Sequence, residues 1–477
     1  MKNLICHLAV ALIFLTVLSL PIFAQSNSTV EGNWLSTLEF NGIKMRLVLK
    51  VSKNADGTFA AKLDSIDQGA NDLEIDSIVQ QNKAVHFEAK KYGMSYEGTL
   101  NEKGDEIAGT FKQGAGSQLL VFKRTVAATK VSRPQDPQKP YPYNEEEVSY
   151  KNVKDNVKLA GTLTLPRGEG KFPAVVLITG SGSQDRDETI LGHRPFLVLA
   201  DYLTRRGIAV LRVDDRGVGG SDLGSRSATT ENYVGDVLAG VGFLKSRREI
   251  NSKQIGLIGH SEGGIIAPMA AVSSNDVAFI VMLAGLGQTG ADAVLSQIAL
   301  LNKANGETPE TIERAGNLQK SLFTVIKSEP DNKIAEQKIN EMLEERKSKM
   351  NEQEMKAFAA VEANIKAQMP ILLSPWYRYF LAYNPRPTLE KVRVPVLALD
   401  GDNDLQVSPK ENLDLIAAAL EKGGNKDYTV KSFPKLNHLF QTSVTGSPSE
   451  YAQIEETISS QVLETIADWI LKHTVKR

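Results

Sequence analysis

The segment Gly259-His260-Ser261-Glu262-Gly263 constrains the fold of this chain more than any other. It follows the short apolar run 255–258, which is typical of an interior strand of a parallel sheet. It precedes the apolar segment 264–271, which is predicted to be a buried helix. Glycines on both sides let strand and helix approach closely and raise the serine hydroxyl above the sheet edge. The pattern predicts that Ser261 is a nucleophile on a strained turn. The alternative is a glycine-rich turn without chemistry.

A serine nucleophile needs a general base, and the chain has six histidines. On such a turn the expected chain order is serine, acid, histidine, which places the base well after Ser261. His438 lies in the turn-rich segment 433–440, behind the strand-like segment 428–432. We therefore predict that His438 is the base, with a structural loop histidine as the alternative. His193 precedes the serine and so has the wrong chain order, and the side chain of His260, inside the pentad, is expected to point away from that of Ser261. The other histidines are excluded by their position in the chain: His7, His86 and His473.

The acid is expected after the preceding strand, which the apolar run 394–399 predicts. Three carboxylates follow it: Asp400, Asp402 and Asp404. Asp400 is closest to the strand and is predicted to order the turn through backbone amides. Asp404 stands in a Gly-x-x-Asp-x-x-Val pattern, and it is the predicted acid. Asp402 remains the alternative. The acid would orient His438 and stabilise its imidazolium.

Negative charge developing on a substrate oxygen needs amide donors. One is predicted to be the backbone N–H of Glu262, directly after the nucleophile. The other is expected in the small-residue segment 179–183, which follows the predicted strand 174–178. We assign it to the backbone N–H of Ser181. The alternative is a flexible glycine loop without a catalytic part.

Residues 148–477 resemble an α/β-hydrolase of the bacterial secreted esterase type, near the serine aminopeptidase-like and dienelactone hydrolase-like branches. The resemblance implies an α/β fold with a mostly parallel central sheet, helices on both faces, and serine hydrolase chemistry without a cofactor. At Thr179 the chain departs from many relatives, which carry histidine there. Asp214, Asp215 and Arg216 are predicted to form a turn-ordering salt bridge. The matching segments are the loop Gly180–Asp187, the segment 214–221, the Ser261 turn, Asp404 and His438.

The first residues have the pattern of a secretory signal peptide. Lys2 precedes an apolar run to Leu20, and a proline and small residues follow, so cleavage is predicted after Ala24. The competing interpretation is a retained membrane anchor. Cleavage would remove Cys6, the single cysteine, and would make the protein secreted or periplasmic. No later segment is long and apolar enough to span a membrane. With 55 Lys and Arg against 57 Asp and Glu, the charge gives no reason to expect nucleic acid as a partner.

The length of 477 residues predicts more than one domain. Residues 25–127 have short alternating segments separated by turn residues, which indicates an antiparallel β-domain, either a lipocalin-like barrel or a sandwich. This domain is predicted to serve packing or dimerisation, with ligand or polymer capture as the alternative, and the sequence is compatible with a homodimer. Four prolines make 128–147 a stiff linker to the hydrolase domain at 148–477.

A helical cap is predicted at about residues 288–385, because the distance from Ser261 to Asp404 exceeds what one strand and one helix require. Such caps exclude water and shape the pocket. Trp376 and Tyr377, in an aromatic segment at its end, are candidate pocket walls, with ordinary packing as an equal alternative.

Together these features predict a secreted, cofactor-free serine hydrolase that cleaves carboxylic esters of small molecules through an acyl-enzyme. An exopeptidase with the same three residues is an alternative enzyme, and it needs a subsite for a charged terminus. A protein that binds a ligand or glycan through its β-domain is the alternative of another class. The histidines are too few and too scattered to predict a metal site.

Overall fold

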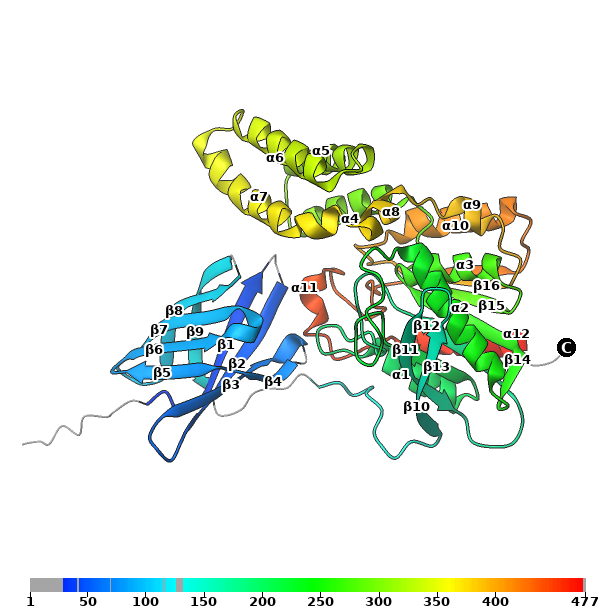
Figure 1. Ribbon diagram of the computed structural model, residues 1–477, viewed down its shortest axis with the longest axis horizontal. Coiled ribbons are helices and arrows are strands. Elements are labelled where there is room, and N and C mark those ends of the chain that lie inside the picture. Colours follow the sequence, from blue (N-terminus) through cyan, green and yellow to red (C-terminus); the bar gives the residue numbers. More distant parts are fainter. Residues whose placement is uncertain (1–28, 41–42, 69, 115, 126–131, 475–477) are drawn as a thin grey trace, which may run out of the picture. The chain divides into compact units, whose positions relative to one another are not determined.

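The computed structural model describes residues 29–40, 43–68, 70–114, 116–125 and 132–474 (Figure 1). The predicted signal peptide, residues 1–24, and Cys6 lie outside these ranges. Among the helices of the described ranges, none combines the length and the apolar character that a bilayer crossing requires.

The N-terminal part of the chain is a curled nine-stranded antiparallel sheet (Figure 1). Strands that are consecutive in the chain are neighbours in the sheet, with the exception of β4 and β5. The first and last strands, β1 and β9, pair antiparallel and join the two groups. The order β4-β3-β2-β1-β9-β8-β7-β6-β5 leaves β4 and β5 at its two ends. The predicted antiparallel β-domain is confirmed. Its strands are β1 (Gly32–Phe40), β2 (Ile43–Lys53), β3 (Phe59–Ser65), β4 (Ala70–Glu74), β5 (Ser77–Gln81), β6 (Ala84–Ala89), β7 (Met94–Leu100), β8 (Glu106–Gln113) and β9 (Gly116–Thr125).

Aromatic side chains fill the core of this sheet. Phe87, Tyr96 and Phe122 are buried, with ring centroids 5.3 Å apart for Phe87–Tyr96 and 5.2 Å apart for Tyr96–Phe122. Trp34 is buried too, and the guanidinium of Arg124 lies 4.1 Å from its ring centroid. Because stacked and edge-on rings bury large apolar areas, these residues account for much of the stability of the sheet.

The C-terminal part is built on a second sheet of eight strands, in the order β10-β11-β13-β12-β14-β15-β16-β17. The pairs β10–β11 and β11–β13 are antiparallel, and all later pairs are parallel. The parallel strands consist largely of buried aliphatic residues, as expected for a sheet covered on both faces. The strands are β10 (Asn144–Asn152), β11 (Val157–Leu165), β12 (Phe172–Ile178), β13 (Ala209–Val213), β14 (Ile250–His260), β15 (Phe279–Leu283), β16 (Val396–Gly401) and β17 (Tyr428–Phe433).

Helices cover both faces of this sheet. The core on one face includes α2 (Thr230–Ser246), α3 (Gly263–Ser273) and α10 (Pro409–Lys422). The core on the other face includes α1 (Pro195–Arg205) and α12 (Ser460–Thr474). The predicted α/β-hydrolase fold is confirmed by this arrangement.

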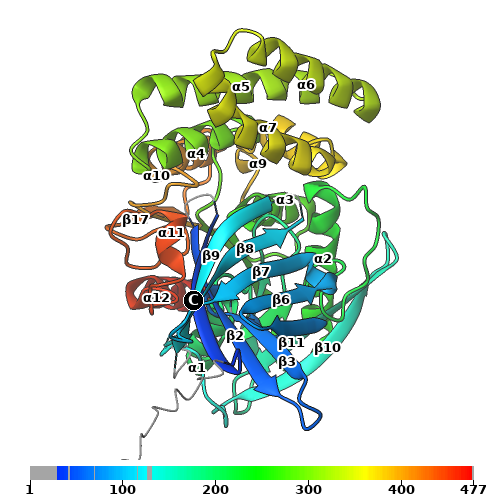
Figure 2. The same ribbon diagram turned by 90° about the vertical axis from the view of Figure 1, so that its left-hand side faces the viewer.

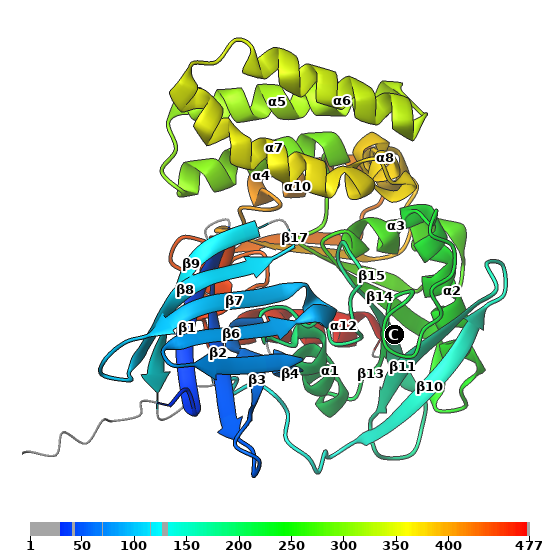
Figure 3. The same ribbon diagram turned by 60° about the vertical axis from the view of Figure 1, so that its left-hand side comes forward.

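A run of helices separates β15 from β16. Figures 2 and 3 show that α4 lies on the sheet side of α5 and α6, and Figure 3 shows the same for α8. These helices bury a core of their own, to which α5, α6, α7 and α8 contribute. The segment lies where the cap was predicted. Its helices are α4 (Gly290–Ala304), α5 (Pro309–Ser328), α6 (Asn332–Lys347), α7 (Glu352–Leu372), α8 (Pro375–Ala382) and α9 (Arg386–Leu389), and one further short helix, α11 (Pro448–Tyr451), follows β17.

Candidate active site

Ser261 lies between the end of β14 and the start of α3, as predicted. Its φ is +53°, a left-handed conformation that is strained for any residue other than glycine. The neighbouring glycines are required by close backbone packing. A Cβ at Gly259 would collide with the Gly263 carbonyl oxygen, and a Cβ at Gly263 with that of Ile178. The turn therefore has the geometry of a nucleophile elbow.

The structure brings His438 and Asp404 together at the ends of neighbouring strands. His438 Nδ1 lies 2.6 Å from Asp404 Oδ2, and both residues are buried. The other oxygen, Oδ1, accepts the backbone N–H groups of Gln406 at 2.7 Å and Val407 at 2.8 Å. A carboxylate held on both sides fixes the orientation of the ring and leaves Nε2 for chemistry. Asp402, the alternative acid, is exposed. Within the described residues its side chain forms no hydrogen bond with His438.

Asp400 lies behind this pair. It is buried, and its Oδ1 accepts the backbone N–H of Gly401 at 2.8 Å, in agreement with the predicted role in the turn. Burial raises the pKa of Asp400 well above its ordinary value, and the neighbouring Asp404 carboxylate adds to the shift.

The two amides assigned to the oxyanion are close to Ser261. A Cβ at Gly180 would lie 3.2 Å from that of Ser261, so the loop after β12 touches the nucleophile. The Ser181 hydroxyl donates to Glu262 Oε2 at 2.8 Å, which links the loop to the residue after the serine. Among the described residues, no hydrogen bond uses the backbone N–H of Ser181 or Glu262. Both donors are therefore available to a substrate oxygen.

A cavity of about 500 Å³ opens beside this turn. Its walls include Gly180 and Glu262, which flank the nucleophile, and Trp376 from α8. The Glu262 carboxylate is buried and accepts three hydrogen bonds, from the Ser181 hydroxyl, the Thr230 hydroxyl at 2.7 Å and Trp376 Nε1 at 2.9 Å. Trp376 thus reaches from the cap to the elbow, at the predicted pocket wall.

Tyr377 lies next to Trp376 but lines a different cavity. This second cavity, of about 810 Å³, lies between the helices α4 to α8. Burial raises the pKa of Tyr377 to about 12. Both predicted wall residues belong to α8, but of the two Trp376 alone lines the cavity beside Ser261.

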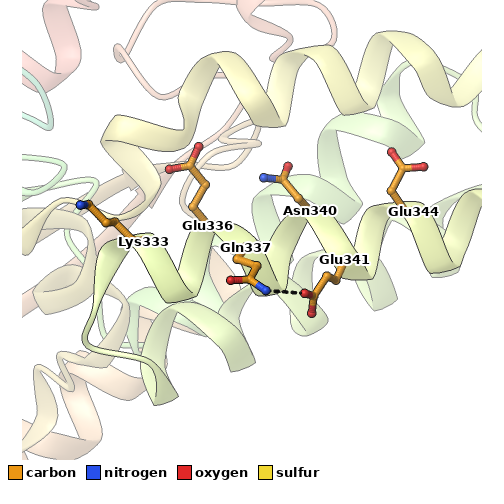
Figure 4. A pocket seen from close by; sticks show the side chains of 6 residues that line it. All are labelled: Lys333, Glu336, Gln337, Asn340, Glu341 and Glu344. Carbon is orange, nitrogen blue, oxygen red and sulfur yellow. Dashed lines mark hydrogen bonds between the residues drawn. The ribbon is translucent and has the colours of Figure 1, made fainter.

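A third depression, on the surface of α6, has a different composition. Its walls belong to this one helix, and Gln337 Nε2 donates to Glu341 Oε1 at 2.8 Å within it (Figure 4). Chemistry on a bound molecule requires groups that converge from several segments, as they do beside Ser261. The α6 depression lacks such convergence, and we assign no chemistry to it. Its lining residues are Lys333, Glu336, Gln337, Asn340, Glu341 and Glu344.

The charged triplet after β13 forms its ion pairs with partners outside the triplet, and Asp214 also accepts the backbone N–H of Gly220 in the turn. Asp214 pairs with Arg186 at 2.7 Å. Arg216 pairs instead with Asp155 and Asp236, both at 2.6 Å. These carboxylates are distant in sequence, so no local pattern indicated them.

Asp215, the middle residue of the triplet, lines the cavity beside Ser261. It accepts the Thr179 hydroxyl at 2.8 Å and the Gln184 backbone N–H at 2.9 Å. Burial raises the pKa of Asp215 to about 7. Thr179, which stands where many relatives carry histidine, therefore orders the loop through Asp215.

Two buried residues near the site were not predicted to act there. His260 Nδ1 lies 2.9 Å from Glu188 Oε1, and His260 Nε2 lies 3.0 Å from the backbone oxygen of His438. Glu188 comes from the loop between β12 and α1, 72 residues before His260. No spacing rule links the two positions, so the sequence offered no signal for the pair.

Comparison with known proteins agrees with this architecture. The family model described as serine aminopeptidase, S33, matches residues 195–442, just over half of the chain. The esterase EstD of Thermotoga maritima is 25% identical over 315 residues, which cover 66% of this chain and 66% of that esterase. An uncharacterized 31.7 kDa protein of Escherichia coli is 26% identical over 277 residues, covering 57% of this chain and 85% of that protein. A solved esterase of Pyrococcus furiosus has a TM-score of 0.44 and 16% identity, covering 72% of this chain and 97% of that one.

The matched segment contains Ser261, Asp404 and His438, and the sheet and helices around them form the α/β-hydrolase fold. The chain therefore belongs to the serine aminopeptidase S33 family of α/β-hydrolases.

Proposed function

We propose that the protein is a serine hydrolase that cleaves carboxylic esters, with Ser261 as nucleophile, His438 as general base and Asp404 as the orienting acid. The observation that carries the proposal is the 2.6 Å contact between His438 Nδ1 and Asp404 Oδ2 beside a strained serine elbow. The likeness to the Thermotoga esterase supports an ester substrate. A role of the N-terminal sheet in ligand binding stays a prediction.

In this mechanism Ser261 Oγ attacks the ester carbonyl while His438 Nε2 takes the hydroxyl proton. The carbonyl oxygen becomes an oxyanion held by the backbone N–H groups of Ser181 and Glu262. Collapse of the tetrahedral intermediate breaks the bond to the alcohol, which leaves with the proton from His438. Water then attacks the acyl-enzyme by the same route and releases the acid and free Ser261. Asp404 stabilises the imidazolium in both halves without taking its proton.

Substrate class is tested by comparing turnover of p-nitrophenyl esters of increasing acyl length with turnover of aminoacyl-nitroanilides. We expect ester turnover with an optimum at short to medium chains, because the cavity beside Ser261 has a volume of about 500 Å³. Prior labelling with a fluorophosphonate should abolish it, since the label occupies the serine. Failure of a folded protein both to hydrolyse esters or anilides and to take up the label would contradict the proposal.

One observation favours a second candidate, an exopeptidase that releases N-terminal amino acids. The carboxyl groups of Asp215 and Glu262 both line the cavity beside the nucleophile. Such a pair could accept an ammonium group, although Glu262 already accepts three hydrogen bonds. Hydrolysis of the aminoacyl-nitroanilides at a higher kcat/KM than that of the esters would favour this second candidate.

The Trp376→Phe variant tests the contact between cap and elbow. Phenylalanine keeps a ring but loses the N–H that donates to Glu262 Oε1. Because a buried carboxylate that loses a donor costs about 1–3 kcal/mol, we expect kcat/KM for the preferred ester to fall roughly 5- to 100-fold. Steady-state kinetics measure the effect. The adjacent Tyr377→Phe variant, which changes only the cap cavity, should keep kcat/KM within about twofold. Equal losses in the two variants would contradict the assignment of Trp376 to the catalytic cavity.

A further inference from the structure

A buried acidic group connects the elbow to the loop that carries the predicted oxyanion donor. Glu188 is 3% exposed, and its Oε1 accepts two hydrogen bonds. One comes from the backbone N–H of Gly180 at 2.8 Å, the residue before Ser181. The other comes from Nδ1 of His260 at 2.9 Å, the residue before Ser261. One carboxylate oxygen of Glu188 therefore binds the residue before the predicted oxyanion donor Ser181 and the residue before the predicted nucleophile Ser261.

His260 extends this connection to the general base. Its Nε2 donates to the backbone oxygen of His438 at 3.0 Å, and the two imidazole rings lie 4.8 Å apart. Both ring nitrogens of His260 thus face acceptors, a carboxylate and a carbonyl. Only a doubly protonated ring can donate to both. Burial opposes that charge, yet Glu188 and the His438 carbonyl together raise the pKa of His260 above its ordinary value.

Hydrogen bonds within its own loop hold Glu188 in place. Glu188 has a φ of +53°, and its backbone N–H donates to the backbone oxygen of Asp185 at 2.9 Å. Asp185 Oδ1 in turn accepts the backbone N–H groups of Asp187 and Thr189. A charged acceptor held in this way forms stronger and shorter hydrogen bonds than a neutral one.

We propose that His260 and Glu188 form a buried imidazolium–carboxylate pair that holds the nucleophile, the general base and the oxyanion loop at fixed mutual positions. The inference rests on the proposed function, because it assigns His438 as the base and Ser181 as an oxyanion donor. His260 and Glu188 act through these residues and are positioning residues. They touch the backbone behind the site, so their loss should lower kcat and leave KM nearly unchanged.

The decisive variants are His260→Gln, Glu188→Gln and Glu188→Ala. Because misplacement of a reacting group by about 1 Å can cost 10²-fold in rate, we expect His260→Gln and Glu188→Ala to lower kcat for the preferred ester roughly 10- to 100-fold. Glu188→Gln keeps an acceptor for Gly180 but lacks the charge that stabilises a doubly protonated His260, so it should recover only part of the activity lost in Glu188→Ala. Full recovery in Glu188→Gln would overturn the charged pair, because a neutral acceptor would then be sufficient.

His473→Gln is the matched control. His473 also bonds one carbonyl and one carboxylate, those of Trp469 at 2.7 Å and Asp427 at 3.2 Å, but it lies in the terminal helix α12. We expect its kcat to stay within about twofold of the wild type. A loss in His473→Gln equal to that in His260→Gln would overturn the proposal, since it would show that any such histidine matters alike.

A spectroscopic measurement keeps the proposal testable even if a variant does not fold, which removal of one member of a buried ion pair can cause. Nitrogen-15 NMR of the wild-type histidines at neutral pH should show one ring with two bound protons, and this signal should be absent in a folded His260→Gln. A singly protonated His260 would overturn the proposal. If Ser261→Ala retained full ester turnover, the proposed function itself would fail. If Ser261→Ala were inactive and His260→Gln fully active, only the positioning pair would be wrong.

Discussion

Replacement of Ser261 by alanine is expected to lower kcat for ester hydrolysis about 10⁶-fold, the loss typical of removing a triad nucleophile. The substitution removes only the hydroxyl group, and the cavity and the two oxyanion amides remain. KM should therefore change little, and a residual rate about 10³-fold above that in water is expected from those groups. Steady-state kinetics on the preferred p-nitrophenyl ester measure kcat and KM, and loss of fluorophosphonate labelling shows that the reactive hydroxyl is gone.

Ser273→Ala is a suitable control, because Ser273 lies at the other end of the helix that the elbow begins. Its hydroxyl donates to the Met269 oxygen at 2.7 Å and is exposed. It should retain wild-type kcat. Ester turnover that persists in Ser261→Ala and is lost in Ser273→Ala would exclude Ser261 as the nucleophile.

Replacement of Asp404 by asparagine is expected to lower kcat about 10⁴-fold, the loss known for the same change in a serine protease triad. Asparagine fits the space and can still accept the Gln406 and Val407 amides. Its NH₂ group, however, donates and cannot accept the hydrogen bond from His438 Nδ1–H, so the histidine adopts the tautomer that cannot act as base. A pH–rate profile and kcat at the optimum give the size of the effect.

The Asp402→Asn variant tests which of the two carboxylates, Asp404 or the alternative Asp402, orients His438. Asp402 is exposed, two residues from Asp404, and the substitution makes the same chemical change. Its kcat should stay within about threefold of the wild type. The assignment of the acid would be reversed if the loss fell on Asp402→Asn and Asp404→Asn stayed active.

The positions of Ser261, Asp404 and His438 could be predicted because each is fixed by a short segment next to a strand. Strain at Ser261 follows from its glycine neighbours, and His438 follows from chain order once Ser261 is set. The sequence pattern favoured Asp404 as the acid but left Asp402 open as the alternative. The backbone amides of Gln406 and Val407, which fold back onto Asp404, distinguish it in the structure.

Features that depend on distant segments could not be predicted. The Arg216 ion pairs use Asp155 and Asp236, and the His260 pair uses Glu188, because these side chains meet only after the sheet has formed. Trp376 and Tyr377 are adjacent in sequence, yet they point into separate cavities, since successive residues of a helix lie about 100° apart. The sequence could not tell which of them lines the cavity beside Ser261.

The pairing of β1 with β9 has a consequence for how the N-terminal sheet is made. As the chain emerges during synthesis, β1–β4 and β5–β8 can each form ladders between consecutive strands. In the sheet as described, however, the two groups are joined through β9, whose Thr125 pairs with Asn33. Closing a loop that spans the whole sheet is slow compared with forming hairpins. The two halves therefore become one sheet only when the last strand has been synthesised, just before the chain of the hydrolase begins.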